Sequence, residues 1–182
     1  MSLTPQAGKV VSVFGSNAPT AGDESYAAAR EVGRRLAELG YAIANGGYGG
    51  VMEASSRGAS EAGGDTIGVV CSIWSSTANR HTGRTVVTSG LLERLNKLIE
   101  LGTGGYVVLP GGTGTLVELA TVWELMAKGL MPRRPTVCVG GFWRPVIELM
   151  AGARPGCEEL VTVAATPREL ERHFPPVRGS LR

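Results

Sequence analysis

The stretch "VVLPGGTGTLVELATVWE" (Val107–Glu124) places an apolar run, a pair of glycines and a helical pattern in direct succession. An unbroken apolar run that ends in glycine predicts a buried strand leading into a tight loop. The residues that follow have the apolar spacing of a helix. The stretch therefore predicts a strand–loop–helix unit, from which parallel α/β sheets are built.

Strand-length apolar runs and helical patterns alternate along the whole chain. The predicted strands lie in "KVVSVFGS" (9–16), "YAIANGG" (41–47), "TIGVV" (66–70), "GYVVLPGG" (105–112), "PTVCVGG" (135–141) and "LVTVAA" (160–165). Predicted helices fill the segments between them, and a last helix follows Thr166, with Glu169 completing a capping box. The alternation predicts one α/β domain with a Rossmann-like, doubly wound parallel sheet and helices on both faces. We expect this domain to span residues 9–175, with tails at 1–8 and 176–182.

Composition and charge narrow the class of protein. Hydrophobic residues make up 43% and charged residues 19%, as in an ordinary globular protein. The formal net charge of +2 is too small to indicate binding to nucleic acid. The three cysteines lack metal-ligand spacing, and no signal peptide or membrane-spanning run is present. We therefore expect a cytoplasmic protein with no metal site, no bound cofactor and no membrane contact.

Three glycine-bearing loops follow predicted strands: "GSNAPTAG" (15–22), "NGGYGG" (45–50) and "PGGTGT" (110–115). Ligands of open parallel sheets bind at the carboxyl ends of the strands, where helix N-termini favour phosphate. One such loop alone is more often a tight connection, but three at one sheet edge favour a site. The candidate phosphate- or nucleotide-binding residues are Gly15, Ser16, Gly46, Gly47, Gly49, Gly111, Gly112, Thr113, Gly114 and Thr115.

Neither familiar phosphate motif is present. Read from Gly47, the dinucleotide fingerprint has Met52 in place of its third glycine, and there is no P-loop. The glycine loops therefore favour a mononucleotide or sugar phosphate over NAD or ATP.

Two charged residues near the motif each allow a structural and a functional interpretation. Glu118 lies three residues after Thr115, so the pair fits a capping box as well as a catalytic carboxylate. Arg94 is either a solvated residue or a functional cation, on a helix whose Leu91, Leu95 and Leu98 we expect to face the core.

"PGGTGTLVE" resembles the PGGxGTxxE signature of the Lonely guy-type phosphoribohydrolases, a superfamily often mislabelled as lysine decarboxylases, and the resemblance extends over nearly the whole chain. It implies a Rossmann-like, generally dimeric protein that binds AMP-like nucleotides. The best-known members hydrolyse cytokinin riboside 5′-monophosphates to free base and ribose 5-phosphate. By this resemblance, the phosphate lies on the amides of Gly112–Thr115, and Glu118 and Arg94 match the functional glutamate and arginine.

Two departures resemble a neighbouring branch that includes molybdenum-cofactor carrier proteins. The chain has "ERLNK" (93–97) where the family usually has E-R-K, and Glu53 stands where G-L-M-G ends in glycine. Two functions therefore stay open: an N-glycosidic bond hydrolase, and a non-catalytic nucleotide or molybdenum-cofactor carrier. Lysine decarboxylation is disfavoured because neither Lys97 nor Lys128 has the context of a Schiff-base site.

Two further segments carry expectations. "ELATVWELMAKGLM" (118–131) has more apolar surface than one helix face can bury, which predicts a homodimer interface. Its candidate residues are Trp123, Leu125, Met126, Leu130 and Met131. The polar stretch 72–90 is expected to be a loop, either solvated or closing over the ligand.

Overall fold

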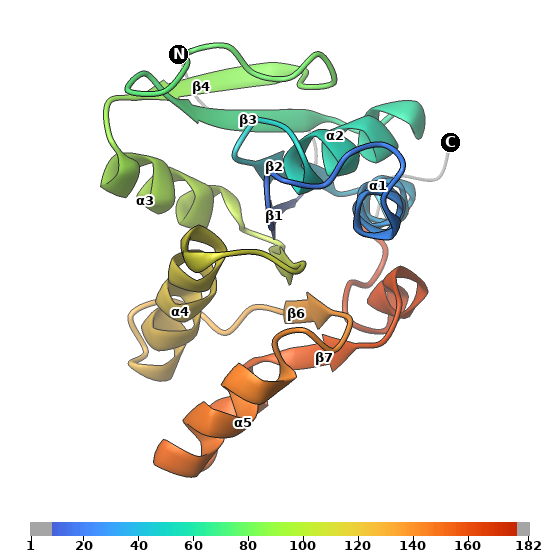
Figure 1. The fold of residues 1–182 in the computed structure, drawn as a ribbon. Coiled ribbons are helices and arrows are strands. Elements are labelled where there is room, and N and C mark those ends of the chain that lie inside the picture. The colour runs from blue at the N-terminus through green and yellow to red at the C-terminus, as the bar shows by residue number, and fades with distance from the viewer. Residues whose placement is uncertain (1–8, 178–182) are drawn as a thin grey trace.

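The computed structural model describes residues 9–177, which form one sheet of seven parallel strands (Figure 1). The strands are β1 (Val10–Phe14), β2 (Ala42–Asn45), β3 (Thr66–Cys71), β4 (Arg84–Thr88), β5 (Gly105–Val108), β6 (Thr136–Val139) and β7 (Thr162–Ala164). Their spatial order is β4-β3-β2-β1-β5-β6-β7. The chain thus runs outward from β1 to one edge and returns to β5, so the order reverses between β1 and β5. In such sheets the reversal point is where ligands bind.

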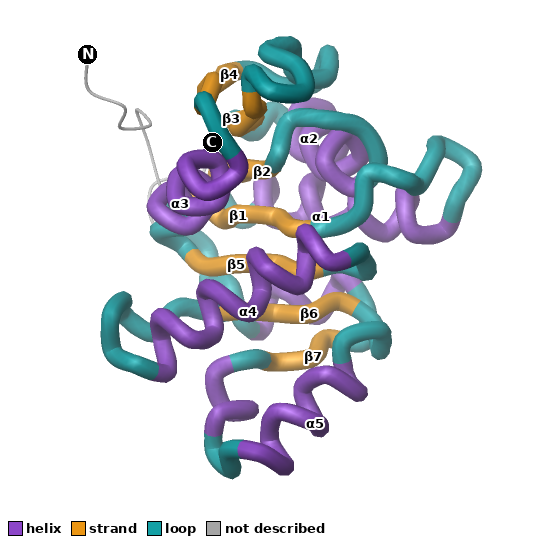
Figure 2. The backbone as a smooth tube through the Cα atoms, turned by 60° about the vertical axis from the view of Figure 1, so that its left-hand side comes forward, coloured by secondary structure: helices purple, strands orange, loops and turns teal. Residues whose placement is uncertain are grey.

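Helices cover both faces of the sheet. They are α1 (Glu24–Glu38), α2 (Val51–Glu61), α3 (Leu91–Leu101), α4 (Thr113–Ala127) and α5 (Arg144–Ala153), with short 3₁₀ helices η1 (Cys157–Leu160) and η2 (Pro167–Arg172). Residues of α1, α2 and η2 belong to one core cluster, and residues of α3, α4 and α5 to a second. Figure 2 shows α3, α4 and α5 on the same side of the strands. The predicted doubly wound α/β fold is confirmed.

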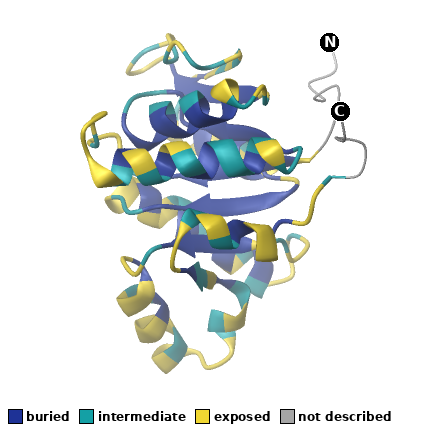
Figure 3. Cartoon of the chain, turned by 90° about the vertical axis from the view of Figure 1, so that its right-hand side faces the viewer, coloured by how far each residue is buried: buried dark blue, intermediate teal, exposed yellow. Residues whose placement is uncertain are grey.

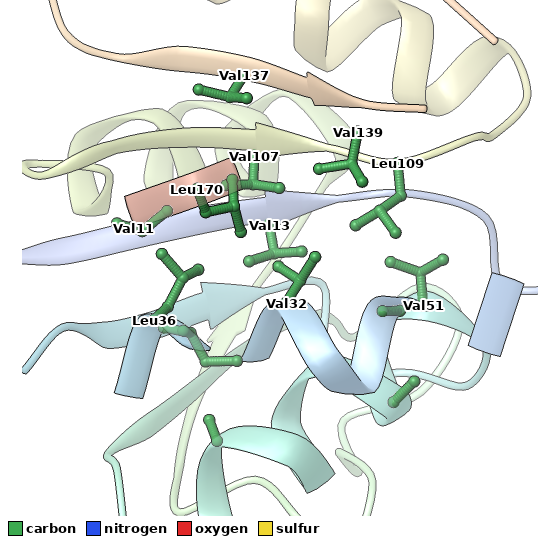
Figure 4. Close-up of a cluster of buried hydrophobic side chains, with 14 of the residues drawn as sticks. Val11, Val13, Val32, Leu36, Val51, Val107, Leu109, Val137, Val139 and Leu170 are labelled. Atoms are coloured by element: carbon green, nitrogen blue, oxygen red, sulfur yellow. The ribbon is translucent and has the colours of Figure 1, made fainter. Parts of the chain in front are cut away.

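The alternation of side chains along β1 explains why two cores form. Val11 and Val13 pack in the first cluster, where Figure 4 shows them directed toward Val32 and Leu36 of α1. Phe14 packs on the opposite face with α3 and α4. Because successive side chains of a strand point to opposite faces, an apolar strand supplies both cores. The central strands are accordingly buried throughout (Figure 3).

Three local predictions are wrong. The polar stretch 72–90 contains β4, an edge strand whose alternating, partly exposed side chains concealed it. The segment after Thr166 forms the 3₁₀ helix η2, and Glu169 accepts from the Ala165 N–H, so the capping box at Thr166 does not form. Leu91, expected to face the core, is 53% exposed because it lies at the first position of α3.

The predicted tail at 1–8 lies outside the described residues, as does 178–182. Val177 donates its N–H to the Leu39 carbonyl, so the chain still contacts α1 beyond Pro175. Within residues 9–177, every helix is too short or too polar to cross a membrane.

Close contact between α1 and α2 depends on one glycine in each helix, which faces the backbone of the other helix. A Cβ on Gly33 of α1 would lie 1.9 Å from the backbone oxygen of Ser55, and one on Gly58 of α2 would lie 1.8 Å from that of Arg30. Backbone atoms cannot yield as flexible side chains do, so only glycine allows this crossing. The crossing matters because α2 carries one of the glycine loops at its start.

We expect Gly33→Ala to destabilise the fold by about 1–3 kcal/mol or more, because the helices must separate. The matched control is Gly152→Ala, in α5, where an added Cβ meets nothing within 4 Å. Alanine there should stabilise by about 0.5–1 kcal/mol through its higher helix propensity. Urea denaturation measures both, and equal effects would contradict the packing argument.

Candidate functional site

The loops after β1, β2 and β5 are joined through one residue at the reversal point. Ser16 donates its N–H to the Pro110 carbonyl (3.1 Å) and accepts the N–H of Val51 (2.8 Å). Val51 is the first residue of α2, so the opening N–H of that helix is used inside the protein. All three predicted glycine loops therefore meet at one edge of the sheet, and Ser16 fixes their spacing with its backbone.

The N-terminus of α4 differs because it is open. Gly112 is its N-cap without a side-chain cap, and Gly112, Thr113 and Gly114 are exposed. The first N–H groups of a helix have no partner inside it, and its dipole favours an anion there. A hollow of about 400 Å³ borders this loop, lined in part by Ser16, Pro110 and Gly111. The backbone amides of residues 113–115 are therefore available to bind an anion.

Thr115 and the second glycine loop have mainly internal contacts. Thr115 is buried, and a Cβ on Gly111 would lie 2.2 Å from its hydroxyl oxygen. Asn45, buried at the end of β2, donates to the Met52 carbonyl and accepts the N–H of Gly47. The Gly47 amide therefore shapes the turn. Sequence reasoning missed Asn45, although a polar residue closing an apolar strand was the available signal.

Arg94, on α3, is buried beside β3 at the carboxyl edge of the sheet, with 9% of its surface exposed. Its Nε donates to the Val69 carbonyl (2.7 Å), which is available because β2 stops at Asn45 whereas β3 continues to Cys71. A Cβ on Gly46 would lie 1.7 Å from Nη2 of Arg94. The interpretation of Arg94 as a solvated residue is therefore wrong, and Gly46 leaves room for its guanidinium.

Helix α3 is held in place by two polar contacts near its C-terminus. The Ser12 hydroxyl donates to the Leu98 carbonyl (2.6 Å), and the Tyr106 hydroxyl donates to the Ile99 carbonyl (2.8 Å). Both donors come from central strands, so α3 is anchored to the middle of the sheet. This anchoring places Arg94, one turn earlier, beside β3.

Glu118 is partly buried in α4, one turn inside the helix. Burial raises the pKa of Glu118 to about 7, and the positive charge of Arg94 acts in the opposite direction. The two side chains therefore lie within electrostatic reach of each other. The capping-box alternative is wrong because α4 already begins at Thr113, which places Thr115 inside the helix.

Two further residues tie the stretch 72–90 to the second glycine loop. Asn79 donates its backbone N–H and its Nδ2 to the Gly47 carbonyl, and Nδ2 also donates to the Tyr48 carbonyl. The Tyr48 hydroxyl accepts the N–H of Cys71 (2.8 Å) and donates to the Ser75 carbonyl (2.9 Å). The stretch after β3 is thus a fixed wall of the site, which its polar composition did not reveal.

Comparison with known proteins identifies the family. A model of the SLOG cluster4 family matches residues 8–130, which run from β1 through α4 and include the three glycine loops, Arg94 and Glu118. The chain belongs to the SLOG cluster4 family. This membership, with the relatives below, confirms the resemblance to the Lonely guy-type superfamily that the "PGGTGTLVE" motif carries.

Two relatives of this SLOG cluster4 chain come from an archaeon and a bacterium. An uncharacterised protein of Archaeoglobus fulgidus is 29% identical over 125 residues, covering 65% of this chain and 77% of that protein. A cytokinin riboside 5′-monophosphate phosphoribohydrolase of Mycobacterium tuberculosis is 33% identical over 116 residues, covering 62% of this chain and 61% of the enzyme. The match thus spans about three fifths of the enzyme's length.

Solved structures extend the comparison over nearly the whole chain. The molybdenum cofactor carrier protein of Chlamydomonas reinhardtii has a TM-score of 0.69 at 29% identity, covering 91% of this chain and 95% of the carrier. The molybdenum cofactor binding protein of Rippkaea orientalis has a TM-score of 0.71 at 24% identity, covering 92% and 96%. The second likeness shows the shared fold alone.

The raised pKa of Glu118 predicts a pH-dependent cost to stability. The folded chain holds this proton more tightly than the unfolded chain, so stability falls as the pH rises from the ordinary glutamate value of about 4.3 toward about 7. In Glu118→Gln that loss is absent. Between pH 4 and pH 8 the stability of the variant relative to wild type should therefore rise, by at most about 3 kcal/mol. Urea denaturation at both pH values measures this.

The matched control is Glu148→Gln, which removes an exposed carboxylate on α5 to which the burial argument does not apply, measured at the same two pH values. A flat difference for Glu118→Gln would show that its carboxyl group is not desolvated.

Proposed function

We propose that this protein is a nucleoside 5′-monophosphate phosphoribohydrolase, which cleaves the N-glycosidic bond of an AMP-like substrate, including cytokinin riboside 5′-monophosphates, to free base and ribose 5-phosphate. The observation that carries the proposal is a half-buried carboxylate, Glu118, one turn inside a helix whose N-terminus is open to an anion. The relationship to the mycobacterial phosphoribohydrolases supports it.

The phosphate in this proposal binds at the N-terminus of α4. The amides of residues 113–115 and the Thr113 hydroxyl are its donors. Gly15, Ser16, Gly46, Gly47 and Gly111 then act as shaping residues, since their small size or backbone contacts set the loops around the anion. A Cβ on Gly49 would meet only the Asn17 carbonyl oxygen, at 3.8 Å, so its position does not require glycine for space. One helical turn is about 5 Å long, roughly the distance from a 5′-phosphate into the ribose. Glu118 is therefore placed for the sugar.

Glu118 supplies the chemistry at the sugar. Cleavage of the bond between C1′ and the base nitrogen builds positive charge on the ribose, as in other glycoside hydrolyses. An ionised carboxylate stabilises that charge and accepts a proton from the attacking water, while the bonding electrons leave with the base, which takes up a proton from solvent to become the free base. Arg94 contributes hydrogen-bond donors to the leaving side of the substrate.

Incubation with AMP and with N⁶-substituted AMP analogues tests the enzyme, with free base measured by chromatography. Glu118→Gln should lower the rate by about 100-fold or more. Glu148→Gln, which replaces an exposed glutamate on α5, should leave the rate unchanged. Because the ionised form acts, kcat/KM of the wild type should rise with pH through about 7, the pKa of Glu118 in the free protein.

A non-catalytic carrier is the second candidate, because a molybdenum cofactor carrier matches 91% of the chain at 29% identity. The same open helix end suits the phosphate of that cofactor. Calorimetry separates the two functions. Tight binding of AMP or of a pterin phosphate without release of base favours the carrier, and a rate that Glu118→Gln does not change contradicts the enzyme.

We also propose that the protein is a homodimer in which a second copy covers the groove between α4 and α5. The groove, about 530 Å³, is lined largely by apolar side chains, among them Leu116, Leu149 and Met150. Of the residues of α5, only Ile147 is buried, so most of this helix faces outward (Figure 3). Glu124 and Arg154 stand together at the groove and offer opposite charges that a two-fold axis can pair.

This surface differs from the one expected from sequence. Trp123 lines the groove but is only 7% exposed, because most of its ring packs in the second core, and Met126 is 4% exposed. Most of the apolar excess of these two side chains is therefore buried within the chain. Leu130 is 73% exposed but lies past the end of the helix.

Light scattering at micromolar concentration should give the mass of a dimer for the wild type. Leu149→Arg, at a side chain 68% exposed in the groove, should give the mass of a monomer because it buries a charge without a partner. Leu92→Arg, 72% exposed on α3, should stay dimeric. A monomeric wild type, or dissociation by both variants alike, contradicts the assignment of this groove.

A further inference from the structure

Trp74 is an exposed aromatic side chain that is nevertheless held rigidly at the site. It is 57% exposed, whereas the other two tryptophans, Trp123 and Trp143, are 7% and 3% exposed. Its ring lies edge-on to Tyr48, with ring centroids 6.3 Å apart. A single exposed apolar side chain is ordinary on a protein surface, but this ring is also packed against Tyr48 and lies within cation–π distance of the buried Arg94.

The backbone that carries Trp74 is fixed from two directions. Trp74 and Ser75 both donate their N–H groups to the Cys71 carbonyl at 3.0 Å, which closes a turn directly after β3. The Tyr48 hydroxyl bridges the same turn, since it accepts from Cys71 and donates to Ser75. The ring therefore projects from a braced turn.

Arg94 joins this aromatic pair to the rest of the site. Its guanidinium carbon lies 5.5 Å from the centre of the Tyr48 ring and 5.8 Å from that of Trp74. These are distances at which a cation is attracted to a ring face. Its charge also acts on Glu118, so the arginine connects the aromatic pair to the carboxylate. The groups follow one another as the open N-terminus of α4, the Glu118 carboxylate, the Arg94 guanidinium, and the rings of Tyr48 and Trp74.

We propose that Trp74, braced by Tyr48 and Arg94, is a stacking wall for the planar heteroaromatic ring of the ligand. This inference rests on the proposed function, in which the phosphate binds α4 and the sugar lies by Glu118. A ligand with a phosphate, a polar linker and a planar ring would place these parts at the N-terminus of α4, at Glu118 and at Trp74, respectively. Planar rings stack on indole regardless of their hydrogen-bonding pattern, and Arg94 adds donors at the ring edge. The shared chemistry fits a purine monophosphate or a pterin phosphate.

Binding is measured by calorimetry in the Glu118→Gln background, which prevents turnover, with AMP, neopterin monophosphate and ribose 5-phosphate as probes. Trp74→Ala should lower the affinity for the ring-bearing ligand by roughly 5- to 150-fold, the range found when a base loses its aromatic partner. Affinity for ribose 5-phosphate, which lacks a ring, should not change. Trp74→Phe should retain most of the affinity because phenylalanine still stacks.

Ile73→Ala is the matched control, because Ile73 is the neighbouring apolar side chain and is 67% exposed. It should leave all three affinities unchanged. Ligand stacking should also quench tryptophan fluorescence in the wild type, and Trp74→Phe should abolish the quenching since the other two indoles are buried. Whichever ring-bearing probe depends on Trp74 identifies the ring as purine or pterin.

The failures are distinguishable. If none of the three probes binds, the proposed function fails. If AMP and ribose 5-phosphate bind with equal affinity and Trp74→Ala changes neither, the phosphate site stands and the stacking wall is refuted. A change in mass by light scattering on Trp74→Ala would show instead that the ring packs in a subunit interface, which also overturns the inference.

Discussion

The site depends on two hydrogen bonds of one serine backbone. The N–H of Ser16 reaches the loop after β5, and its carbonyl oxygen reaches the first N–H of α2. Three loops that are far apart in sequence are thereby held at one spacing. A phosphate that binds through several backbone amides needs these donors at fixed positions, because a hydrogen bond forms only within a narrow range of distance and angle. The two hydrogen bonds of Ser16 hold the loops at fixed positions without a ligand.

The same constraint divides the glycine loops by role. The second loop uses its polar groups internally: Asn45 accepts the N–H of Gly47, and Asn79 donates to the Gly47 carbonyl oxygen. Only the N-terminus of α4 keeps its amides exposed among the helix starts that follow these two loops. One loop therefore offers donors while the other builds the wall that supports Tyr48. Similar glycine content conceals this difference, because glycine permits both uses.

The charged pair follows from how the strands end. Because β2 is shorter than β3, the Val69 carbonyl has no strand partner on that side and accepts Arg94 instead. Burying a guanidinium costs free energy unless such acceptors are present. Burial raises the pKa of Glu118 to about 7, and the positive charge of Arg94 acts against that rise. The enzyme and the carrier hypotheses share the open N-terminus of α4 as the phosphate site, and only the enzyme hypothesis needs Glu118 to act on the sugar.

The sequence by itself determined the class of fold, the family and the edge of the sheet where the site lies. Apolar runs of strand length and glycine turns are local signals, and the "PGGTGTLVE" motif stands in the loop beside the reversal point. Only the tertiary structure decided that Arg94 is buried, that Glu118 does not cap its helix, and that the turn after β3, which carries Trp74, packs against Tyr48. These properties arise between segments distant in the chain, as from Val69 to Arg94 or Gly47 to Asn79. Local spacing carries no record of such contacts, because burial and hydrogen-bond partners are set by the neighbours that folding brings together.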